Sequence, residues 1–530
     1  MDFDFSAPYP SQRSPVMGRN MVATSQPLAA QAGLRMLDRG GNAIDAALAA
    51  AIAMPVVEPT GNGLGSDAFA ILHDGTQLHG LNASGRAPEA WTPERFAGHA
   101  QMPERGWDSV TTPGAVSAWV ELSERFGALP FEALFEPAIA YAEGGYPVSP
   151  IIAGQWASAV PILKDQPGFA ETFMPEGRAP RAGELFRAPS MARALRRIAE
   201  TRGAAFYTGE IAEAIAAFAR AQGGALTEAD LAAHRADWVG TISRRYGDID
   251  AHEIPPNGQG IAALIALGII EHTEIAEVGP DSSAGLHLQI EAMKLALADT
   301  YAHVGDAEAM VVAPAELLDD GYLRDRAALI DRDRAGDPRH GLPGPSGTIY
   351  ITAADADGRM ISYIQSNYAG FGSGVVEPQY GISLQNRGFG FTLNPDSPNV
   401  VGPRKRPFHT IIPGFVTRDQ APLMSYGVMG GPIQAQGHMQ MILRIMTFGQ
   451  NPQAASDAPR WRVLEGRGVA MESAVPAATR DALAALGHEI TTSSPEAAFS
   501  FGGAQLIHRM QNGQYIAGSD HRKDGHAVAF

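Results

Sequence analysis

The sequence predicts an α+β fold in which layers of helices cover antiparallel or mixed β-sheet. Two observations predict it. Helical patterns dominate the first 304 residues, whereas short strand-like runs dominate from residue 348 onward, without the regular alternation of a parallel α/β protein. At 530 residues the chain also exceeds the size at which one simple core stops growing, so two or three domains or one large layered domain are expected.

The amino-terminal part is expected to contain two helices followed by two strands. Ser25 precedes the first helix as a capping residue, an early proline follows, and Gly40-Gly41 closes the helix. A glycine-rich loop, 60–67, leads into the first strand; it lacks the spacing of a nucleotide-binding loop and is interpreted as a close-packed structural loop. The predicted helices are 26–39 and 43–54, and the predicted strands are 68–72 and 78–81.

The middle of the chain is expected to be helical. Thr227 and Asp230 have the spacing of a capping box, which marks the start of one of these helices. The longest helix carries an apolar stripe that predicts a core-facing side, formed by Leu286, Ile290, Met293 and Leu297. The predicted helices are 130–144, 190–201, 208–222, 227–234 and 281–304.

A β-hairpin is predicted around Thr348. Two runs rich in β-branched and aromatic residues, 348–354 and 360–366, flank the turn Asp357-Gly358. The preceding segment, 340–347, contains too many glycines and prolines for a helix or strand and should be an exposed loop. Beyond the hairpin, we expect strands at 381–384, 410–416, 504–510 and 515–517 and a helix from Pro432 to about Met446.

Thr348 itself has two interpretations. It can be an ordinary residue that opens a strand after a loop. Alternatively, its hydroxyl can attack the Gly347 carbonyl and cut the chain, which frees an α-amine. Such an amine titrates near ~7.7–8.0 and could act as the base for its own hydroxyl at neutral pH. The stretch alone leaves both interpretations open.

Composition excludes several classes of function. The chain has no cysteine, and therefore no disulfide, thiolate metal site or cysteine nucleophile. The net charge of -17 argues against binding to nucleic acid or a membrane surface. No apolar run is long enough to span a bilayer, and the acidic start lacks the features of a secretory signal, so a cytoplasmic location is expected.

Three catalytic or binding motifs are absent. No serine has glycine both two places before and two places after it, as a serine esterase would. Pro256 occupies the position where a zinc-hydrolase helix would need a histidine after His252. The stretch 355–358 resembles part of a calcium loop but lacks the closing glutamate, and is interpreted as the hairpin turn. We therefore expect neither a metal nor another cofactor.

Several short segments together resemble the γ-glutamyltransferase family of N-terminal-nucleophile hydrolases, from about Ser25 to the end of the chain. Their order and spacing carry the resemblance: 40–47, 112–116, 291–296, 405–407, 429–431, 457–460 and 518–522. The resemblance implies a four-layer αββα sandwich and a precursor cut between Gly347 and Thr348. It implies two subunits, 1–347 and 348–530, that together form one domain, with a higher oligomer left open.

The resemblance also assigns catalytic roles. Thr348 corresponds to the nucleophile, and Ser366 to the second threonine that supports it. Gly430 and Gly431 correspond to the pair whose N–H groups form the oxyanion hole, which agrees with their position before a predicted helix. These roles imply an amidohydrolase or acyltransferase that acts through an acyl-enzyme; a non-catalytic relative of the same fold is the alternative.

Departures from the family pattern concern the substrate. Gly390 stands where an aspartate holds the α-amine of a γ-glutamyl group, and Arg387 where a glutamine is expected. His409-Thr410 replaces the serine pair that holds the α-carboxylate, and Arg86 either replaces the usual carboxylate-binding arginine or pairs with a surface acid.

The chain between Asn399 and Pro403 is too short for the family's lid loop, as in the branch that includes cephalosporin acylases. We therefore expect hydrolysis of small-molecule amides whose acyl part carries a free carboxylate, such as a glutaryl group. The alternative is a γ-glutamyltransferase or glutathione hydrolase.

Overall fold

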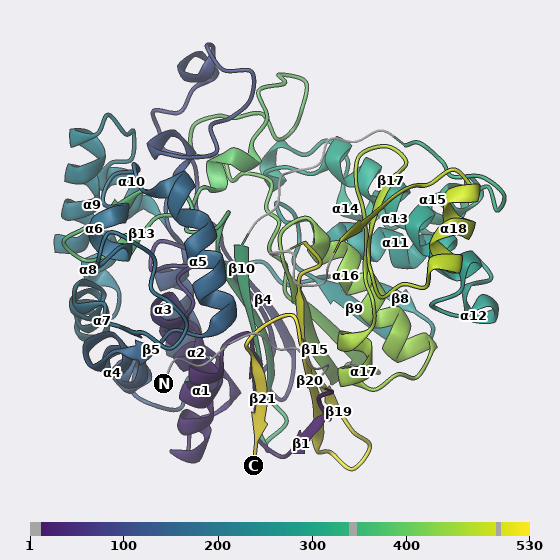
Figure 1. The fold of residues 1–530 in the computed structure, drawn as a ribbon, viewed down its shortest axis with the longest axis horizontal. Coiled ribbons are helices and arrows are strands. Elements are labelled where there is room, and N and C mark those ends of the chain that lie inside the picture. The colour runs from purple at the N-terminus through teal and green to yellow at the C-terminus, as the bar shows by residue number, and fades with distance from the viewer. Residues whose placement is uncertain (1–11, 339–346, 494–499) are drawn as a thin grey trace.

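The computed structural model describes residues 12–338, 347–493 and 500–530, and two large antiparallel sheets form its centre (Figure 1). The first sheet consists, in spatial order, of β21 (His526–Ala529), β2 (Met21–Thr24), β10 (Gly347–Ala354), β11 (Met360–Tyr368), β3 (Asp67–His73), β4 (Leu78–Ala83) and β7 (Asp237–Trp238). The second sheet consists of β1 (Val16–Gly18), β20 (Tyr515–Ser519), β19 (Gly503–Arg509), β15 (Ala421–Met429), β14 (Gly414–Arg418), β9 (Ile249–Glu253) and β8 (Ile242–Tyr246).

Helices cover the outer faces of both sheets (Figure 1). On the side of the first sheet lie α1 (Pro27–Asp38), α2 (Ala43–Val57), α3 (Ala115–Phe126), α4 (Glu136–Gly144), α5 (Pro150–Leu163), α6 (Phe169–Phe173), α7 (Pro189–Thr201), α8 (Ala204–Tyr207), α9 (Glu210–Ala221) and α10 (Glu228–Ala233). On the side of the second sheet lie α11 (Gly260–Glu271), α12 (Ile275–Val278), α13 (Ser283–His303), α14 (Pro314–Leu317), α15 (Asp320–Ala327), α16 (Ile433–Ile442), α17 (Pro452–Asp457) and α18 (Ala477–Ala485). The order helix, sheet, sheet, helix confirms the predicted αββα sandwich.

Shorter strands lie outside the two large sheets. They pair as β5 (Tyr146–Pro147) with β6 (Leu185–Phe186), β12 (Val376–Glu377) with β13 (Ile382–Ser383), and β16 (Trp461–Val463) with β17 (Gly468–Glu472) and β18 (Glu489–Ser493).

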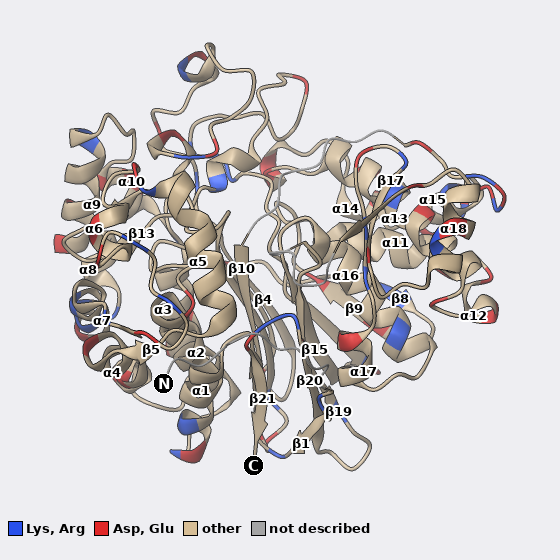
Figure 2. Ribbon diagram, in the orientation of Figure 1, with Lys and Arg blue, Asp and Glu red and all other residues tan. Residues whose placement is uncertain are grey.

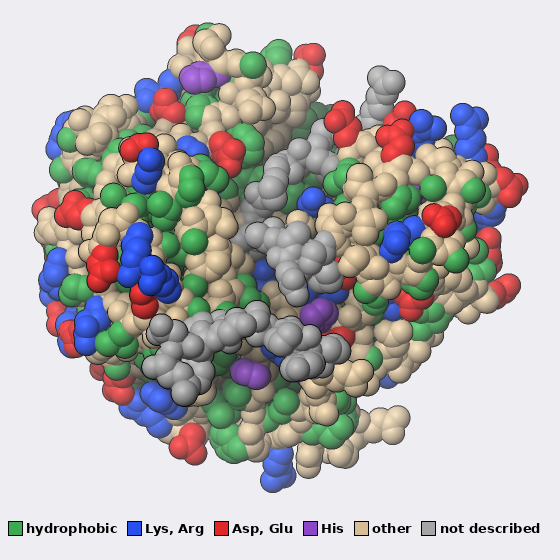
Figure 3. Space-filling view, in the orientation of Figure 1, with side chains coloured by type: hydrophobic (Ala, Val, Ile, Leu, Met, Phe, Trp, Pro, Cys, Tyr) green, Lys and Arg blue, Asp and Glu red, His purple; other side chains and the backbone are tan. Residues whose placement is uncertain are grey.

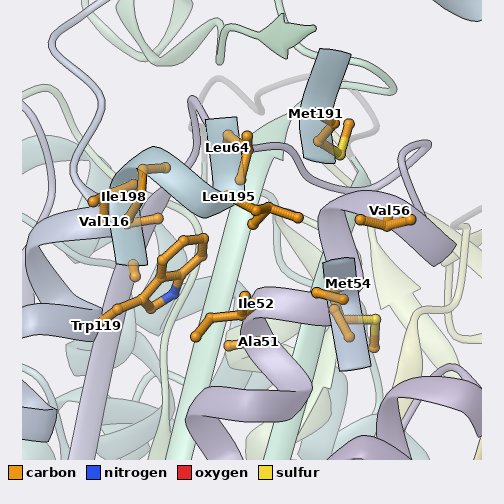
Figure 4. Packing of buried hydrophobic residues seen from close by; sticks show 14 of the residues in the cluster. Ala51, Ile52, Met54, Val56, Leu64, Val116, Trp119, Met191, Leu195 and Ile198 are labelled. Carbon is orange, nitrogen blue, oxygen red and sulfur yellow. The ribbon is translucent and has the colours of Figure 1, made fainter. Parts of the chain in front are cut away.

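Separate apolar cores hold the layers together. In the core between the first helical layer and its sheet, Ala51 and Ile52 of α2 lie beside Trp119 of α3 (Figure 4). Every residue of α2 is buried, as expected of a helix that is apolar on all sides. A second core fills the space between α11, α13, α16 and the second sheet. A third lies between the two sheets and includes Phe69 and Tyr350.

The elements predicted from the sequence are present, with different ends in some cases, whereas several others, among them α3, α5, α11, β8, β9 and β15, were not predicted. The first helix is capped by the Gln26 side chain, whereas Ser25 donates a hydrogen bond to Glu58 at 2.7 Å. The predicted helix 130–144 starts as a 3₁₀ segment and becomes α-helical only at Glu136. The predicted strand 410–416 begins later, at Gly414, because the preceding residues turn toward the site described below. The predicted hairpin and the capping box at Thr227 are confirmed.

Charged residues lie mainly on the outer helices and loops, and few lie on the strands of the two large sheets (Figure 2). On the face shown in Figure 3, acidic and basic groups are interspersed. Among the described residues, no helix combines the length and the apolar character that crossing a bilayer requires.

Candidate active site

Three buried polar residues form a row across three neighbouring strands of the first sheet. Thr348 is the second residue of β10, Ser366 lies on β11, and Asp67 is paired directly with Ser366 at the start of β3. Residues opposite each other in an antiparallel pair point to the same face of the sheet. All three side chains are fully buried. The predicted nucleophile and its predicted helper are therefore neighbours, and a carboxyl group that the sequence analysis did not select lies next to them.

The hydroxyl groups of Thr348 and Ser366 converge on the Gly347 carbonyl oxygen. Each donates a hydrogen bond to this oxygen at 2.7 Å, and their own oxygens are 3.2 Å apart. The Ser366 hydroxyl also accepts a hydrogen bond from the Tyr368 backbone N–H at 2.8 Å. The predicted cleavage bond, between Gly347 and Thr348, therefore carries a carbonyl that two hydroxyl groups polarise.

The predicted oxyanion glycines lie between the end of β15 and the start of α16. Gly430 has φ 127° and Gly431 has φ 71°, conformations that favour glycine. In the first turn of α16, Gln434 donates from Nε2 to the Thr348 hydroxyl at 3.5 Å. Its Oε1 accepts from the Ile412 N–H at 3.1 Å. The amino-terminal end of α16, where a helix favours negative charge, therefore lies beside the predicted nucleophile.

Gln259 connects the oxyanion glycines to the predicted substrate-binding segment. Its Nε2 donates to the Thr410 carbonyl at 2.6 Å and to the Gly431 carbonyl at 2.9 Å. Because both partners are acceptors, the orientation of the side-chain amide is fixed. Gln259 was not among the site residues predicted from the sequence. The only signal was its place in a proline- and glycine-rich loop immediately before α11.

The guanidinium of Arg387 is a buried cation near Thr348, Ser366 and Asp67, and among the described residues some of its N–H groups are free to bind a ligand. Its side chain is 1% exposed, its Nη1 donates to the Thr410 hydroxyl at 3.0 Å, and its guanidinium carbon lies 4.7 Å from the centre of the Tyr368 ring. Within the described part of the chain, Nε and Nη2 have no hydrogen-bond partner. Burial lowers the pKa of Arg387 to about 10, with nearby Asp67 acting in the opposite direction, so the group remains charged at neutral pH. Two unpaired donors on a buried cation are suited to bind a planar anion such as a carboxylate.

His409 is fully buried but does not offer a free donor. Its Nε2 lies 3.1 Å from the Asp67 carboxyl oxygen Oδ2, and its Nδ1 accepts a long hydrogen bond from the Ile411 N–H at 3.4 Å. Burial, reinforced by the charges of Arg387 and Arg406, lowers the pKa of His409 well below its ordinary value. The ring is therefore neutral near pH 7, and both its nitrogens are occupied within the protein.

Arg86 lies in a different environment. Its side chain is 38% exposed, pairs with Asp306 at 3.6 Å and Asp237 at 3.9 Å, and donates to the Arg404 carbonyl at 3.2 Å. It lines a cavity of about 750 Å³ together with Arg404 and other residues. Arg86 therefore pairs with one partly exposed acid, Asp237, and with one buried acid, Asp306.

One cluster of possible metal ligands lies elsewhere, on α13 and near β18. Among the described residues, His287, Glu291 and His488 are close enough to hold an ion. The buried Lys294 ammonium occupies this cluster, because it donates to Glu291 at 2.9 Å and to the Gly336 carbonyl at 3.0 Å. The cluster therefore already holds a cation of its own, and it ties α13 to the segment that precedes the predicted cleavage site.

Comparisons with known proteins cover almost the whole chain. A family model described as gamma-glutamyltranspeptidase matches residues 29–530. The chain is 36% identical over 534 residues to the oxamate amidohydrolase proenzyme of Klebsiella pneumoniae, covering 98% of this chain and 99% of that protein. It is 34% identical over 528 residues to the glutathione hydrolase-like YwrD proenzyme of Bacillus subtilis, covering 98% and 100%. The crystal structure of a cephalosporin acylase from Bacillus halodurans aligns with a TM-score of 0.95 at 47% identity, over 100% of this chain and 99% of that one.

Proposed function

This chain belongs to the gamma-glutamyltranspeptidase family and is an enzyme of the hydrolase and acylase type, and from this premise we propose that it is a self-processing amidohydrolase with Thr348 as its nucleophile. Its substrates are amides whose acyl part carries a free carboxylate. The observation that carries the proposal is the contact of the Thr348 and Ser366 hydroxyl groups with the Gly347 carbonyl.

Self-processing begins with the attack of Thr348 Oγ1 on the carbonyl carbon of Gly347. The Thr348–Gly347 C–N bond then breaks, its nitrogen takes up the hydroxyl proton, and an ester remains between Gly347 and the threonine oxygen. Ser366 stabilises the developing negative charge by donating to the carbonyl oxygen. Water hydrolyses the ester, which leaves a large subunit, 1–347, and a small subunit, 348–530, whose first residue carries a free α-amine.

The mature enzyme uses the same hydroxyl on the substrate. The free α-amine takes the Thr348 proton, and the oxygen attacks the amide carbonyl. The N–H groups of Gly430 and Gly431 bind the resulting oxyanion, and the protonated amine gives its proton to the departing nitrogen. Water, deprotonated by the α-amine, then releases the acid. With no lid loop between Asn399 and Pro403, we expect hydrolysis to dominate over transfer to an amino-acid acceptor.

We expect Gly431→Ala to lower kcat by about 10²-fold, because loss of one oxyanion donor typically costs this much. The φ of 71° at this position favours glycine, so the added methyl group should shift the peptide. Steady-state kinetics on processed protein would measure the effect. An unchanged kcat with complete processing would show that the glycine has only a structural role.

Arg387 supports the assignment of the acyl group. A substrate carboxylate is the partner that its two unpaired N–H groups lack, and the Thr410 hydroxyl lies 3.0 Å from the third nitrogen. Gln259 ties Thr410 to Gly431 and thus links the carboxylate site to the oxyanion glycines. We therefore propose that the acyl chain places its carboxylate at Arg387 and its scissile carbonyl beside the oxyanion glycines.

The surroundings of Gly390 support the absence of an ammonium site. Gly390 lines a cavity of about 680 Å³ whose described lining contains aromatic residues, among them Tyr301, Phe389 and Phe408, and no aspartate or glutamate. An ammonium group there would lose its hydration without gaining a charged partner. A γ-glutamyl group, which carries an α-amine, should therefore bind less well than a glutaryl group.

The experiment compares glutaryl and γ-glutamyl anilides on the same processed preparation. We expect a higher kcat/KM for the glutaryl compound by at least about tenfold, since an unpaired buried charge costs more than the ~1.4 kcal/mol that a factor of ten represents. If the γ-glutamyl compound is preferred by about tenfold, an acid outside the cavity beside Gly390 binds the amine, and a γ-glutamyl hydrolase replaces our proposal.

A further inference from the structure

Asp67 is a buried acid on the strand next to the proposed catalytic hydroxyl groups. It is the cross-strand partner of Ser366, so its carboxyl group lies on the same face of the sheet. Its Oδ1 accepts a hydrogen bond from the Gly85 N–H at 3.1 Å, and its Oδ2 lies 3.1 Å from His409 Nε2. Both oxygens have partners and the side chain is fully buried, so Asp67 is not placed to bind a substrate ammonium directly.

Asp67 is the main counter-charge of Arg387, because the other groups around Asp67 are either neutral or paired with another acid. Two arginines interact with it electrostatically, Arg387 and Arg406. Arg406 already has an acidic partner, because its Nη1 donates to Asp237 at 2.7 Å. His409 is neutral, and the other titratable group that interacts electrostatically with Asp67, Tyr207, is a partly buried phenol whose pKa burial raises, so it is neutral as well. Arg387 and Asp67 thus form a buried cation and a buried acid that interact electrostatically, and no direct hydrogen bond or ion pair joins them among the described residues.

A substrate carboxylate at Arg387 changes this balance. With Asp67 ionised, the pocket would contain one guanidinium and two carboxylates, and the two like charges would repel at low dielectric. With Asp67 protonated, its Oδ2 proton is donated to His409 Nε2, which requires the tautomer of the neutral ring with its hydrogen on Nδ1, at the expense of the long contact with the Ile411 N–H. The guanidinium and the substrate carboxylate then neutralise each other. The substrate therefore favours the protonated form of Asp67.

We propose that Asp67, held by His409, is a positioning and specificity-determining residue that makes the binding of an acyl carboxylate at Arg387 depend on uptake of a proton. This inference rests on the proposed function, because it requires a carboxylate-bearing substrate. It assigns the proton to the Asp67–His409 pair, which is hydrogen-bonded neither to Gly347 nor to Thr348 in the described part of the chain. The residue acts through Arg387 and is not itself catalytic.

Burial raises the pKa of Asp67 to about 7, although Arg387 acts in the opposite direction. Below this pH the free enzyme already carries the proton, and a carboxylate binds without repulsion. Above it, binding requires proton uptake from solvent. Since a bound carboxylate raises the pKa of Asp67 further, KM should rise as the pH increases through 7 and level off above the pKa of the complex.

The test measures KM from pH 6 to pH 9 for two matched substrates, a glutaryl anilide and the glutaramyl anilide in which a carboxamide replaces the carboxylate. The ratio of the two KM values removes pH effects that are common to both substrates, including the effect of α-amine titration. We expect this ratio to rise by about tenfold over the range if the bound carboxylate raises the pKa by about one unit. In Asp67→Asn, which mimics the protonated acid, the ratio should stay constant at its low-pH value.

Three outcomes would overturn the inference. The KM ratio of the unaltered enzyme could remain constant across the range, which needs no variant to detect. Asp67→Asn could show the same rise as the unaltered enzyme. It could also raise KM for both substrates equally, as a purely structural residue would. If the unaltered enzyme hydrolyses neither anilide, the proposed function itself is contradicted. Failure of the inference and failure of the proposed function are therefore distinguishable.

Discussion

Thr348→Ala should remain a single uncut chain and should show no amidase activity. One hydroxyl performs both reactions in the proposed mechanism, so removing it leaves neither the attack on Gly347 nor the attack on the substrate. The expected loss exceeds about 10⁴-fold, since removal of a nucleophile generally abolishes covalent catalysis. Denaturing electrophoresis and an anilide assay on the purified variant measure the two effects.

Thr348→Ser is the matched control. It keeps the hydroxyl but loses the methyl group that restricts the rotamer, so processing and turnover should persist at a reduced rate. Cleavage of Thr348→Ala at residue 347 would contradict the assignment of the nucleophile. Failure of both variants to fold would be detected by circular dichroism and would call for Thr348→Val as a closer replacement in shape.

Arg387→Met should lower kcat/KM for the glutaryl anilide by about 10²- to 10³-fold, in keeping with the ~2–5 kcal/mol cost of truncating one partner of a buried charge pair. Methionine fills part of the space of the arginine stem but cannot bind a carboxylate. The glutaramyl anilide, which has no carboxylate, should be affected much less. Side-by-side kinetics with the two anilides on processed protein measure the difference.

Arg86→Met provides the control for this prediction. Arg86 is 38% exposed and pairs with Asp306 and Asp237, so its replacement should change kcat/KM by less than about threefold. If Arg86→Met reduces activity on the glutaryl anilide and Arg387→Met does not, the carboxylate site lies at the cavity beside Arg86.

Regular periodicity determined which elements could be predicted from the sequence. The hairpin of β10 and β11 follows from alternating β-branched residues around an Asp-Gly turn, and α13 from its apolar stripe. In contrast, α11 is almost continuously apolar, and periodicity cannot distinguish such a run from a buried strand. β15 was also hard to predict, because a glycine inside a strand pattern, here Gly427, weakens that pattern. The glycine is needed because the Tyr350 ring packs so closely against it that no side chain would fit.

The site was predictable only where its residues are neighbours in the sequence or match the family pattern. Thr348 and Ser366 belong to one hairpin, and the pairing of the adjacent residues Ile349 and Gln365 brings them together. Asp67 and Gln259 reach the site from distant segments, and only the packing of β3 and of the loop before α11 brings them there. The binding role predicted for His409 did not take into account the contact between its Nε2 and Asp67, because these residues are far apart in the sequence.

The most direct test of the central claim is the intact mass of the purified, unaltered protein, combined with amino-terminal sequencing of its smaller chain. Our account predicts two chains whose masses correspond to residues 1–347 and 348–530, apart from any removal of the initiator methionine, with threonine as the first residue of the smaller chain. A single chain of 530 residues that nevertheless hydrolyses amides, or a smaller chain that begins at another residue, would contradict it.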